Sequence, residues 1–184
     1  MPAQYLCRDP KRRQSVLSNP ALNGLDFLDV LDQQAVALWS NPQVPPSQQI
    51  PPRQQTLLVR FLRPPPPLTL QNLRIEGGAR ITAVNAVWIF PASSGPSPPE
   101  TAAEQAFYAS LPDADRTLVI RTDSAGDFST YTLRLVQSQA DSSPPPTIDV
   151  RFASLDFSFK VECPSDFDCK PAVMPLAESP VVAP

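Results

Sequence analysis

Apolar and polar residues alternate over much of the chain in short runs, a pattern that favours β-strands. Strands are predicted over residues 24–32, 55–62, 73–78, 79–90, 116–122, 128–138 and 147–163. The run QTLLVRFL at 55–62 is apolar almost throughout, which is typical of a strand that is covered on both faces. The alternation over 24–32 is imperfect, so this strand is compatible with a β-bulge. LRIEGG at 73–78 ends in a double-glycine turn.

Two of these strands carry aromatic residues whose faces follow from the alternation. In 79–90, Val84, Trp88 and Phe90 are expected on one face, and Ile81, Val87 and Ile89 on the other. Trp88 is expected to be the core aromatic. In 147–163, the first apolar set is Ile148, Val150 and Phe152, and the second is Leu155, Phe157, Phe159 and Val161. The second set keeps the apolar face only if one residue is inserted near residues 153–154, so a β-bulge or a bend is predicted there.

The segment TLVIRTDSAGDFSTYTLRLV predicts a β-hairpin, because the turn-forming residues DSAGD separate two alternating runs. Tyr131 lies on the same face of its run as Leu133 and Leu135. Two interpretations of this tyrosine stay open. It is either the corner tyrosine of an immunoglobulin-like sandwich, with its hydroxyl bonded to backbone upstream, or an ordinary half-buried strand residue.

Two short helices are expected. Asp9 is a suitable N-cap and Pro10 suits the first helical position, so a helix is predicted from Pro10 to Ser18. The alanine-rich segment ETAAEQAFYASL predicts a second helix over 100–111. The predicted fold class is therefore mainly β: an immunoglobulin-like or fibronectin-like β-sandwich with a short N-terminal helix, one short internal helix and proline-rich loops.

Proline is strongly enriched, with 25 residues in a chain of 184, and its clusters divide the chain. Because proline lacks an N–H and fixes its own φ, such clusters interrupt helices and sheets. The predicted organisation is an N-terminal helix–strand extension (1–32), a proline- and glutamine-rich connection (33–55), a β-sandwich domain (56–169) and an extended C-terminal tail (170–184).

Charge and composition argue against most enzymes and against nucleic-acid binding. The net charge is −3, the basic residues are scattered, and histidine is absent. This absence removes a histidine base, a histidine-activated nucleophile and a histidine metal ligand, so no catalytic residue and no cofactor are predicted. Five acidic residues lack a partner histidine or a phosphate-binding loop and are interpreted as solvated carboxylates of turns and strand ends. They are Asp26, Asp29, Asp32, Asp113 and Asp115.

The N-terminus MPAQYLCRDPKRR has no apolar segment before its charges, so neither a signal peptide nor a lipoprotein signal is predicted. No apolar run approaches the length of about 18 residues that a membrane span needs, so no span is expected. The sequence therefore favours a cytoplasmic protein whose thiols stay reduced.

The stretch FKVECPSDFDCKP, residues 159–171, is the main candidate for chemistry. Its candidate residues are Cys163, Pro164, Asp166, Phe167, Asp168 and Cys169. The five-residue spacing between the cysteines departs from common zinc pairs and excludes a thioredoxin-type site. A tight structural turn with buried thiols is favoured, while a metal site at Cys163 and Cys169 and a disulfide stay open as alternatives.

Three elements occur in order along nearly the whole chain: QYLCRDPKRRQSVLSNPALNGLDFLDVLD, then QQTLLVRFLRP with LTLQNLRIEGGARI, and then FSFKVECPSDFDCKP. With these elements the chain resembles the N-terminal region of baseplate assembly proteins, the baseplate J-like wedge proteins of phage-tail-like contractile injection systems. The resemblance implies a structural component without enzymatic activity, which links the hub and spike to the sheath through protein–protein contacts.

The resemblance also implies partners and a location. The partners would be other baseplate subunits of the wedge, hub and sheath in a symmetric hetero-oligomer. Residues 1–20 and 170–184 are expected to contact them, because neither segment can fold alone. The phage-tail-like particle would assemble in the cytoplasm, and both membrane anchoring and release stay open. Family members are much longer than this chain, so a fragment or a free-standing first domain is expected.

A β-sandwich binding module for carbohydrates or a receptor is the alternative function. Such a module needs a cluster of exposed aromatic residues. Those available in loops or helices are Phe107, Tyr108 and Phe167. Because this set is small, the structural role is preferred.

Overall fold

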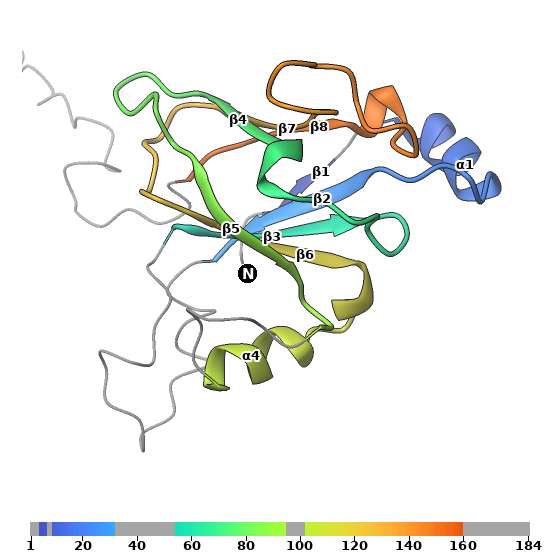
Figure 1. Cartoon of the computed structure of the whole chain (residues 1–184), viewed down its shortest axis with the longest axis horizontal. Helices are drawn as coiled ribbons and strands as arrows, with labels where there is room; N and C mark the ends of the chain where they lie inside the picture. The colour runs from blue at the N-terminus through green and yellow to red at the C-terminus, as the bar shows by residue number, and fades with distance from the viewer. Residues whose placement is uncertain (1–3, 7–8, 32–53, 95–101, 160–184) are drawn as a thin grey trace, which may run out of the picture.

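The computed structural model describes residues 4–6, 9–31, 54–94 and 102–159, and it confirms a mainly β fold (Figure 1). The strands are β1 (Gln4–Leu6), β2 (Leu25–Val30), β3 (Thr56–Phe61), β4 (Leu73–Gly77), β5 (Ala86–Pro91), β6 (Thr117–Thr122), β7 (Tyr131–Leu135) and β8 (Ser154–Phe157). The helices are α1 (Pro10–Ser18) and α4 (Ala102–Ala109), with 3-10 turns η1 (Leu70–Asn72), η2 (Ala114–Arg116) and η3 (Val150–Phe152).

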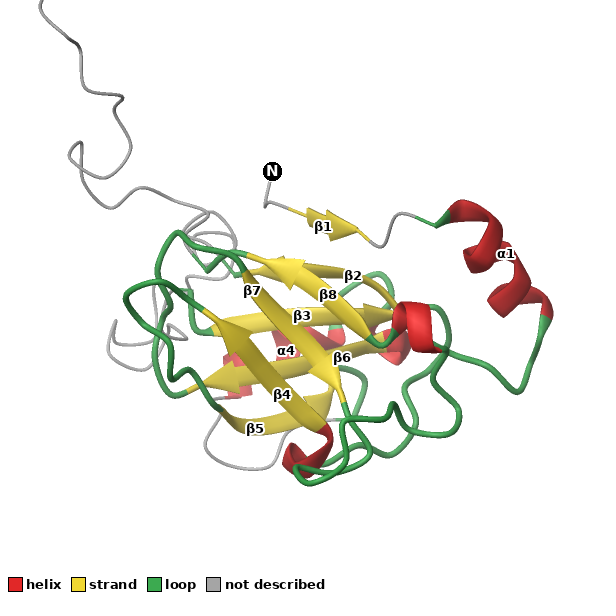
Figure 2. Ribbon diagram, turned by 90° about the horizontal axis from the view of Figure 1, so that it is seen from above, coloured by secondary structure: helices red, strands yellow, loops and turns green. Residues whose placement is uncertain are grey.

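The strands form two antiparallel sheets that pack face to face (Figure 2). One sheet has five strands in the order β1-β2-β3-β6-β5, and the other has three in the order β4-β7-β8. The core between them receives alternate residues of both sheets, because side chains along a strand point to opposite faces. These residues include Leu28, Val30, Val59, Phe61, Leu118, Ile120, Leu133, Leu135, Leu155 and Phe157.

Strand β3 is covered on both faces, as its apolar run predicts. Leu57 and Val59 are fully buried in the core between the sheets. Leu58 points to the opposite face and packs in a second cluster with Tyr108 of α4. Helix α4 therefore lies against the outer face of the five-stranded sheet, on the side away from the three-stranded sheet (Figure 1). The prediction of a short internal helix is confirmed.

Helix α1 has the bounds that its capping residues predict. The side chain of Asp9 accepts a 2.9 Å hydrogen bond from the backbone N–H of Arg12, which satisfies one of the free amides of the first turn. Arg13 forms a two-bond ion pair with Asp26 on β2, at 2.8 and 2.9 Å. Asp26 is only 15% exposed, so its interpretation as a solvated carboxylate is wrong. The partner of Asp26 is Arg13 of helix α1.

The predicted hairpin over residues 117–136 is wrong. Strand β6 belongs to the five-stranded sheet and β7 to the three-stranded sheet, so the connection crosses from one sheet to the other. The turn residues mark a reversal of the chain, but they do not determine pairing. Ile120 of β6 and Leu133 of β7 share the core between the sheets instead of lying side by side in one sheet.

Tyr131 follows the first of its two interpretations, because its hydroxyl returns to backbone upstream. The hydroxyl donates a 2.5 Å hydrogen bond to the carbonyl of Ile81 and accepts a 3.0 Å bond from the backbone N–H of Asp127. The side chain is 1% exposed. This arrangement does not by itself establish an immunoglobulin-like or fibronectin-like topology, which stays a prediction.

The predicted strand over 79–90 begins only at Ala86, and its two faces differ from the prediction. The register with β6 shifts between Ala86 and Trp88, so the alternation changes phase at this bulge. Val84 is buried in the core between the sheets, whereas Trp88 and Phe90 pack on the opposite face beside α4. Trp88 is therefore not the aromatic of the main core.

The predicted long strand over 147–163 is also shorter. The 3-10 turn η3 precedes β8, and the side chain of Asp149 accepts from the backbone N–H of Arg151 to start that turn. Val150 on the turn is 68% exposed, whereas Ile148 and Phe152 are buried, so the prediction that the three share one face is wrong. The second apolar set is confirmed where it is described: Leu155, Phe157 and Phe159 are buried, and Val161 lies outside the described residues.

The predicted domain boundaries stay predictions. Residues 33–53 of the connection and the tail 170–184 lie outside the described residues. Strand β2, which precedes the connection, is paired with β3 inside the five-stranded sheet. The N-terminal segment thus contributes to the core, because Leu25, Leu28 and Val30 are fully buried.

Candidate functional site

The cysteine-containing turn predicted as the main candidate site lies outside the described residues. This holds for Cys163, Pro164, Asp166, Phe167, Asp168 and Cys169. The turn, metal and disulfide interpretations therefore stay predictions. Over 4–6, 9–31, 54–94 and 102–159, no group of three or more histidine, cysteine, aspartate or glutamate residues is arranged to hold a metal ion. None of the helices in the described part of the chain has the length and apolar character that a membrane crossing requires.

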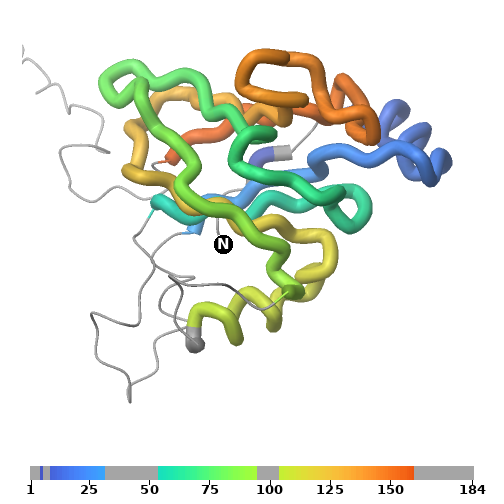
Figure 3. The backbone as a smooth tube through the Cα atoms, viewed as in Figure 1, coloured from blue at the N-terminus to red at the C-terminus, as the bar shows by residue number. Residues whose placement is uncertain are grey.

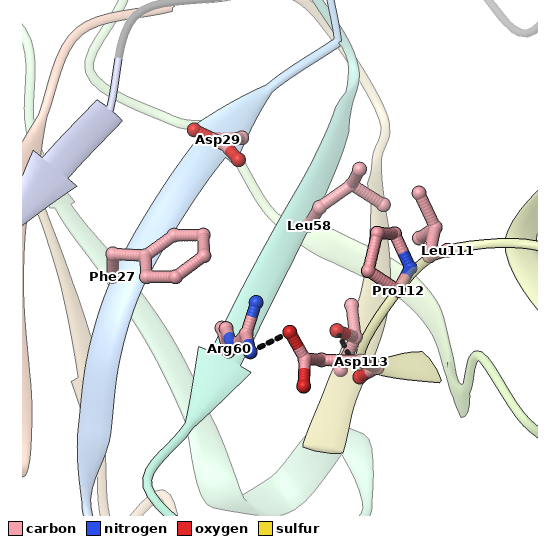
Figure 4. Close-up of a pocket in the computed structure, with 8 residues that line it drawn as sticks. Phe27, Asp29, Leu58, Arg60, Leu111, Pro112 and Asp113 are labelled. Atoms are coloured by element: carbon pink, nitrogen blue, oxygen red, sulfur yellow. Dashed lines mark hydrogen bonds and ion pairs between the residues drawn. The ribbon is translucent and has the colours of Figure 1, made fainter. Parts of the chain in front are cut away.

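A pocket of about 200 Å³ lies on the outer face of the five-stranded sheet, beside the segment that joins α4 to η2 (Figure 4). We call it the Arg60 pocket. Its lining residues are Phe27 and Asp29 of β2, Leu58 and Arg60 of β3, Leu111, Pro112 and Asp113 of the joining segment, and Thr117 of β6. The strand residues share one face because they are two apart along each strand. Alternation thus builds the floor of the pocket, and the joining segment builds its wall.

Phe27 and Arg60 form a cross-strand pair on this floor. They are opposite each other in the register of β2 and β3. The guanidinium carbon of Arg60 lies 5.1 Å from the centre of the Phe27 ring. A cation–π contact of this kind contributes about 0.5–1 kcal/mol at exposed sites and more where water is excluded. The pairing therefore fixes the Arg60 side chain over the sheet.

Asp113 connects the wall of the pocket to its floor. Its carboxylate forms ion pairs with both Arg60 and Arg116. Its backbone carbonyl accepts a 2.8 Å hydrogen bond from the hydroxyl of Thr117. The side chain of Asp113 is 23% exposed, so its interpretation as a solvated carboxylate is wrong. One of the two arginines comes from a distant strand, which a local sequence pattern does not reveal.

One donor of Arg60 has no acceptor among the described residues. The Nε atom is buried and makes no hydrogen bond there, whereas an Nη atom pairs with Asp113. Burial and the nearby Arg116 lower the pKa of the Arg60 guanidinium from its ordinary value. A buried donor without an acceptor costs about 1–3 kcal/mol. The unpaired Nε–H therefore offsets part of the stabilisation that the ion pair between Arg60 and Asp113 provides.

A second ordered surface lies at one end of the sandwich, where the segments 78–85 (green) and 123–130 (yellow-orange) run side by side (Figure 3). The carboxylate of Asp127 accepts the backbone N–H groups of Arg80 and Ile81 and the hydroxyl of Ser129. The Ser129 hydroxyl and the Arg80 amide hold the pKa of Asp127 well below its ordinary range. Ile81 and Phe128 are exposed on these loops, at 39% and 44%.

Sequence reasoning missed the Arg60 pocket. The apolar run at 55–62 predicts a strand that is covered on both faces, and such a strand gives no indication of a pocket. The signal that was available is the charge of Arg60 within that run. A charged residue on an otherwise apolar strand marks the place where the outer face reaches solvent or a polar partner.

Comparison with known proteins identifies a family. A family model described as phage baseplate assembly protein, N-terminal domain, matches residues 1–157. The match covers well over half of the chain and includes strands of both sheets. It confirms the resemblance to the N-terminal region of baseplate assembly proteins. No curated protein and no solved structure matches the chain.

Proposed function

The chain belongs to the family of phage baseplate assembly proteins, whose N-terminal domain it carries, and from this premise we propose that it is a wedge component of a contractile, phage-tail-like injection system. The family match gives it a structural role in a phage baseplate, with other baseplate subunits as partners. The proposal adds that the chain links the hub and spike to the sheath through protein–protein contacts, within a symmetric assembly of different subunits.

We also propose that the chain has no enzymatic activity. The support comes from the sequence, which contains no histidine and no recognisable nucleophile with a partner base. A rigid two-sheet sandwich suits a scaffold, because strands paired on both sides hold the attached loops in fixed positions. The family match is the single observation that carries the proposed role.

The alternative, a carbohydrate- or receptor-binding module, loses support from two of its three aromatic residues. Tyr108 is fully buried, and its hydroxyl donates a 2.9 Å hydrogen bond to Glu104. Phe107 is partly buried against the same cluster, with its ring 5.6 Å from that of Tyr108. Phe167 lies outside the described residues. The described pair packs inward and forms no exposed platform.

The test is co-purification from the assembled particle. The affinity-tagged chain is expressed together with the remaining genes of its particle, and the bound proteins are identified by mass spectrometry. We expect baseplate subunits to be recovered with the chain. A tagged, unrelated β-sandwich of similar size is the control. Recovery of no baseplate subunit above that control would contradict the proposal, and specific glycan binding would favour the alternative.

A further inference from the structure

Strand β4 forms one edge of the three-stranded sheet, with β7 on its other side (Figure 2). We propose that this edge pairs with β4 of a second copy of the chain, antiparallel and centred on Ile75, so that the two small sheets join into one continuous sheet. The inference goes beyond the proposed function and does not depend on it, because the only partner it names is the chain itself.

The hydrogen bonds at the two ends of β4 show which of its residues face the open edge. The amide of Val136 donates to the carbonyl of Asn72 at 2.9 Å, and the amide of Gly78 donates to the carbonyl of Thr130 at 3.3 Å. In an antiparallel ladder, residues that exchange such bonds alternate with residues whose main chain points the other way. The even-numbered residues of β4 therefore face β7, and the odd-numbered ones, among them Ile75, face the open edge.

Two residues of this edge have main-chain groups without a partner among the described residues. Ile75 is partly exposed and Gly77 is exposed, and neither forms a main-chain hydrogen bond on the side away from β7. The start of the edge differs, because the carbonyl of Leu73 accepts a 2.8 Å bond from Gln139 and its amide donates to Leu70. An edge with unpaired N–H and C=O groups is a template for another strand.

The other sheet edges in the described part of the chain are less suited to pairing. Strand β5 is interrupted by the register shift between Ala86 and Trp88 and ends in Pro91, which has no amide. Strand β1 spans three residues. Strand β8 lies against β1 and β2 of the other sheet, and the Ser158 carbonyl that follows it accepts from Tyr5. Strand β4 has neither a register shift nor a proline.

The side chains beside Ile75 select a second copy as the partner. Arg74 and Glu76 carry opposite charges and point to the same, outer face of the sheet. In an antiparallel pair centred on Ile75, Arg74 of each copy lies opposite Glu76 of the other, and the two copies of Ile75 exchange two main-chain bonds. Opposite charges in such cross-strand positions are stabilising. The sequence of the edge is therefore complementary to itself.

The same charges also determine the register. Two neighbouring antiparallel registers would likewise pair the outward-facing main-chain groups. One of them places Glu76 opposite Glu76 of the second copy, and the other places Arg74 opposite Arg74. Like charges directly opposite each other are destabilising. Only the register centred on Ile75 avoids them.

The charged side chains are available for pairing. Glu76 is 43% exposed, and its contacts with Arg74 and Arg134 within the chain are long, at 3.5 and 3.4 Å. Its carboxylate has acceptor sites for a further guanidinium. Arg74 is held by the Ser142 hydroxyl at 3.0 Å and the Gln139 carbonyl at 2.7 Å. Its charge is thus positioned before a partner binds, which lowers the entropic cost of pairing.

The residues at the ends of the strand suit this register. Gly77 of one copy lies opposite Leu73 of the other, where Gln139 covers the edge, and a glycine brings no side chain to that place. Gly77 and Gly78 have φ angles of +114° and +89°, and there the chain turns towards Thr130. The continuation of the chain after β4 therefore turns away from the open edge.

The first test is sedimentation equilibrium of the purified chain. The paired surface is small, as in weak and transient complexes, so we expect a dimer with a dissociation constant of about 0.1–1 mM. Added salt should weaken the dimer, because it screens exposed charge pairs. A chain that stays monomeric at low salt up to about 1 mM would overturn the proposal.

The amide signals of the wild-type chain locate the contact without any substitution. The signals of Ile75 and Gly77 should shift as the concentration rises and dimers form. The signal of Thr132 is the control, because its amide faces β4 within the sheet and should change far less. Dimers that form while the Ile75 signal stays unchanged would rule out pairing through this edge.

Charge reversal tests the register. Arg74→Glu and Glu76→Arg each place like charges opposite each other, so each variant alone should dimerise at least about tenfold more weakly than the wild type. An equimolar mixture of the two variants should regain dimers, because the two acidic side chains of one chain then lie opposite the two basic side chains of the other. Dimers that neither substitution weakens, or a mixture that recovers none, would contradict the antiparallel pairing.

Asp156→Arg is the matched control for Glu76→Arg. Asp156 is exposed on β8, at the opposite edge of the same sheet, and its substitution changes the net charge by the same amount. This variant should dimerise as the wild type does. An equal loss of dimers in both variants would show that net charge, and not pairing of β4, controls association. Thermal unfolding of each variant checks that any loss does not come from misfolding.

Discussion

The hydroxyl of Tyr131 ties three parts of the chain together, and its removal gives a sharp test of the fold. The hydroxyl donates to the carbonyl of Ile81 at 2.5 Å and accepts from the backbone N–H of Asp127 at 3.0 Å. The ring packs edge-on against Phe159, with ring centres 4.8 Å apart. Tyr131→Phe deletes both hydrogen bonds and leaves the ring in place.

The expected loss of stability follows from these contacts. An ordinary hydrogen bond contributes about 0.5–1.5 kcal/mol, and a buried group left without a partner costs about 1–3 kcal/mol. The Ile81 carbonyl and the Asp127 amide lie in loops that water partly reaches, so we expect about 2 kcal/mol for the pair. For a chain of this size, 1 kcal/mol corresponds to about 2–4 °C in melting temperature. Tyr131→Phe should therefore melt about 4–8 °C below the wild type.

The assay is thermal and urea unfolding followed by circular dichroism, with Tyr5→Phe as the control. Tyr5 also donates its hydroxyl to a backbone carbonyl, that of Ser158, but over 3.3 Å and with partial exposure. Its removal should cost less than about 1 kcal/mol. The reasoning would be refuted if Tyr131→Phe unfolded within about 0.5 kcal/mol of the wild type, the range of neutral surface changes, or if the two variants lost the same stability.

Two further predictions concern the same end of the sandwich. The pKa of Asp127 is lowered in the folded protein, so its carboxylate stabilises the fold above the unfolded pKa of about 3.9, and this contribution is lost as the pH falls through the lower folded value. Asp127→Asn should therefore be less stable than the wild type at pH 7, with a difference that shrinks below about pH 4; a difference that stays constant from neutral to strongly acidic pH would contradict this. Gly77 has a φ of +114°, and an added Cβ would lie 2.5 Å from the carbonyl oxygen of Thr130. Gly77→Ala should cost at least about 1–3 kcal/mol in urea unfolding, and wild-type stability in that variant would show that the turn tolerates a side chain.

The sequence predicts the elements whose determinants are local. Helix α1 has the predicted bounds because its cap, Asp9, and its first residue, Pro10, are adjacent in the chain. Strand β3 is covered on both faces because its residues 57–59 form an unbroken apolar run. The bulge in β2 follows from its imperfect alternation. In each case the residues that decide the outcome lie within a few positions of one another.

The features that sequence reasoning missed depend on distant partners. The segments at β6 and β7 look like a hairpin, but pairing is decided by which sheet each strand completes. Trp88 changes face because of a one-residue register shift against β6. The strand ahead of it is shortened because Asp127 accepts the amides of Arg80 and Ile81 and replaces the bonds of a ladder. None of these partners is visible in a local pattern.

The candidate site also depends partly on local pattern and partly on distant partners. Alternation alone places Leu58 and Arg60 on one face of β3. The pairing of Arg60 with Phe27 requires the register between two strands that are separated by a long connection. Its pairing with Asp113 requires the position of the segment after α4. The Arg60 pocket therefore becomes visible only when three segments are assembled.

The central claim is that the chain is a structural part of a phage baseplate that works through protein–protein contacts. The most direct measurement is a cryo-electron microscopy map of the assembled particle that contains the chain. We predict density for the two-sheet sandwich within the baseplate, in contact with neighbouring baseplate subunits. A complete baseplate without this sandwich would contradict the account.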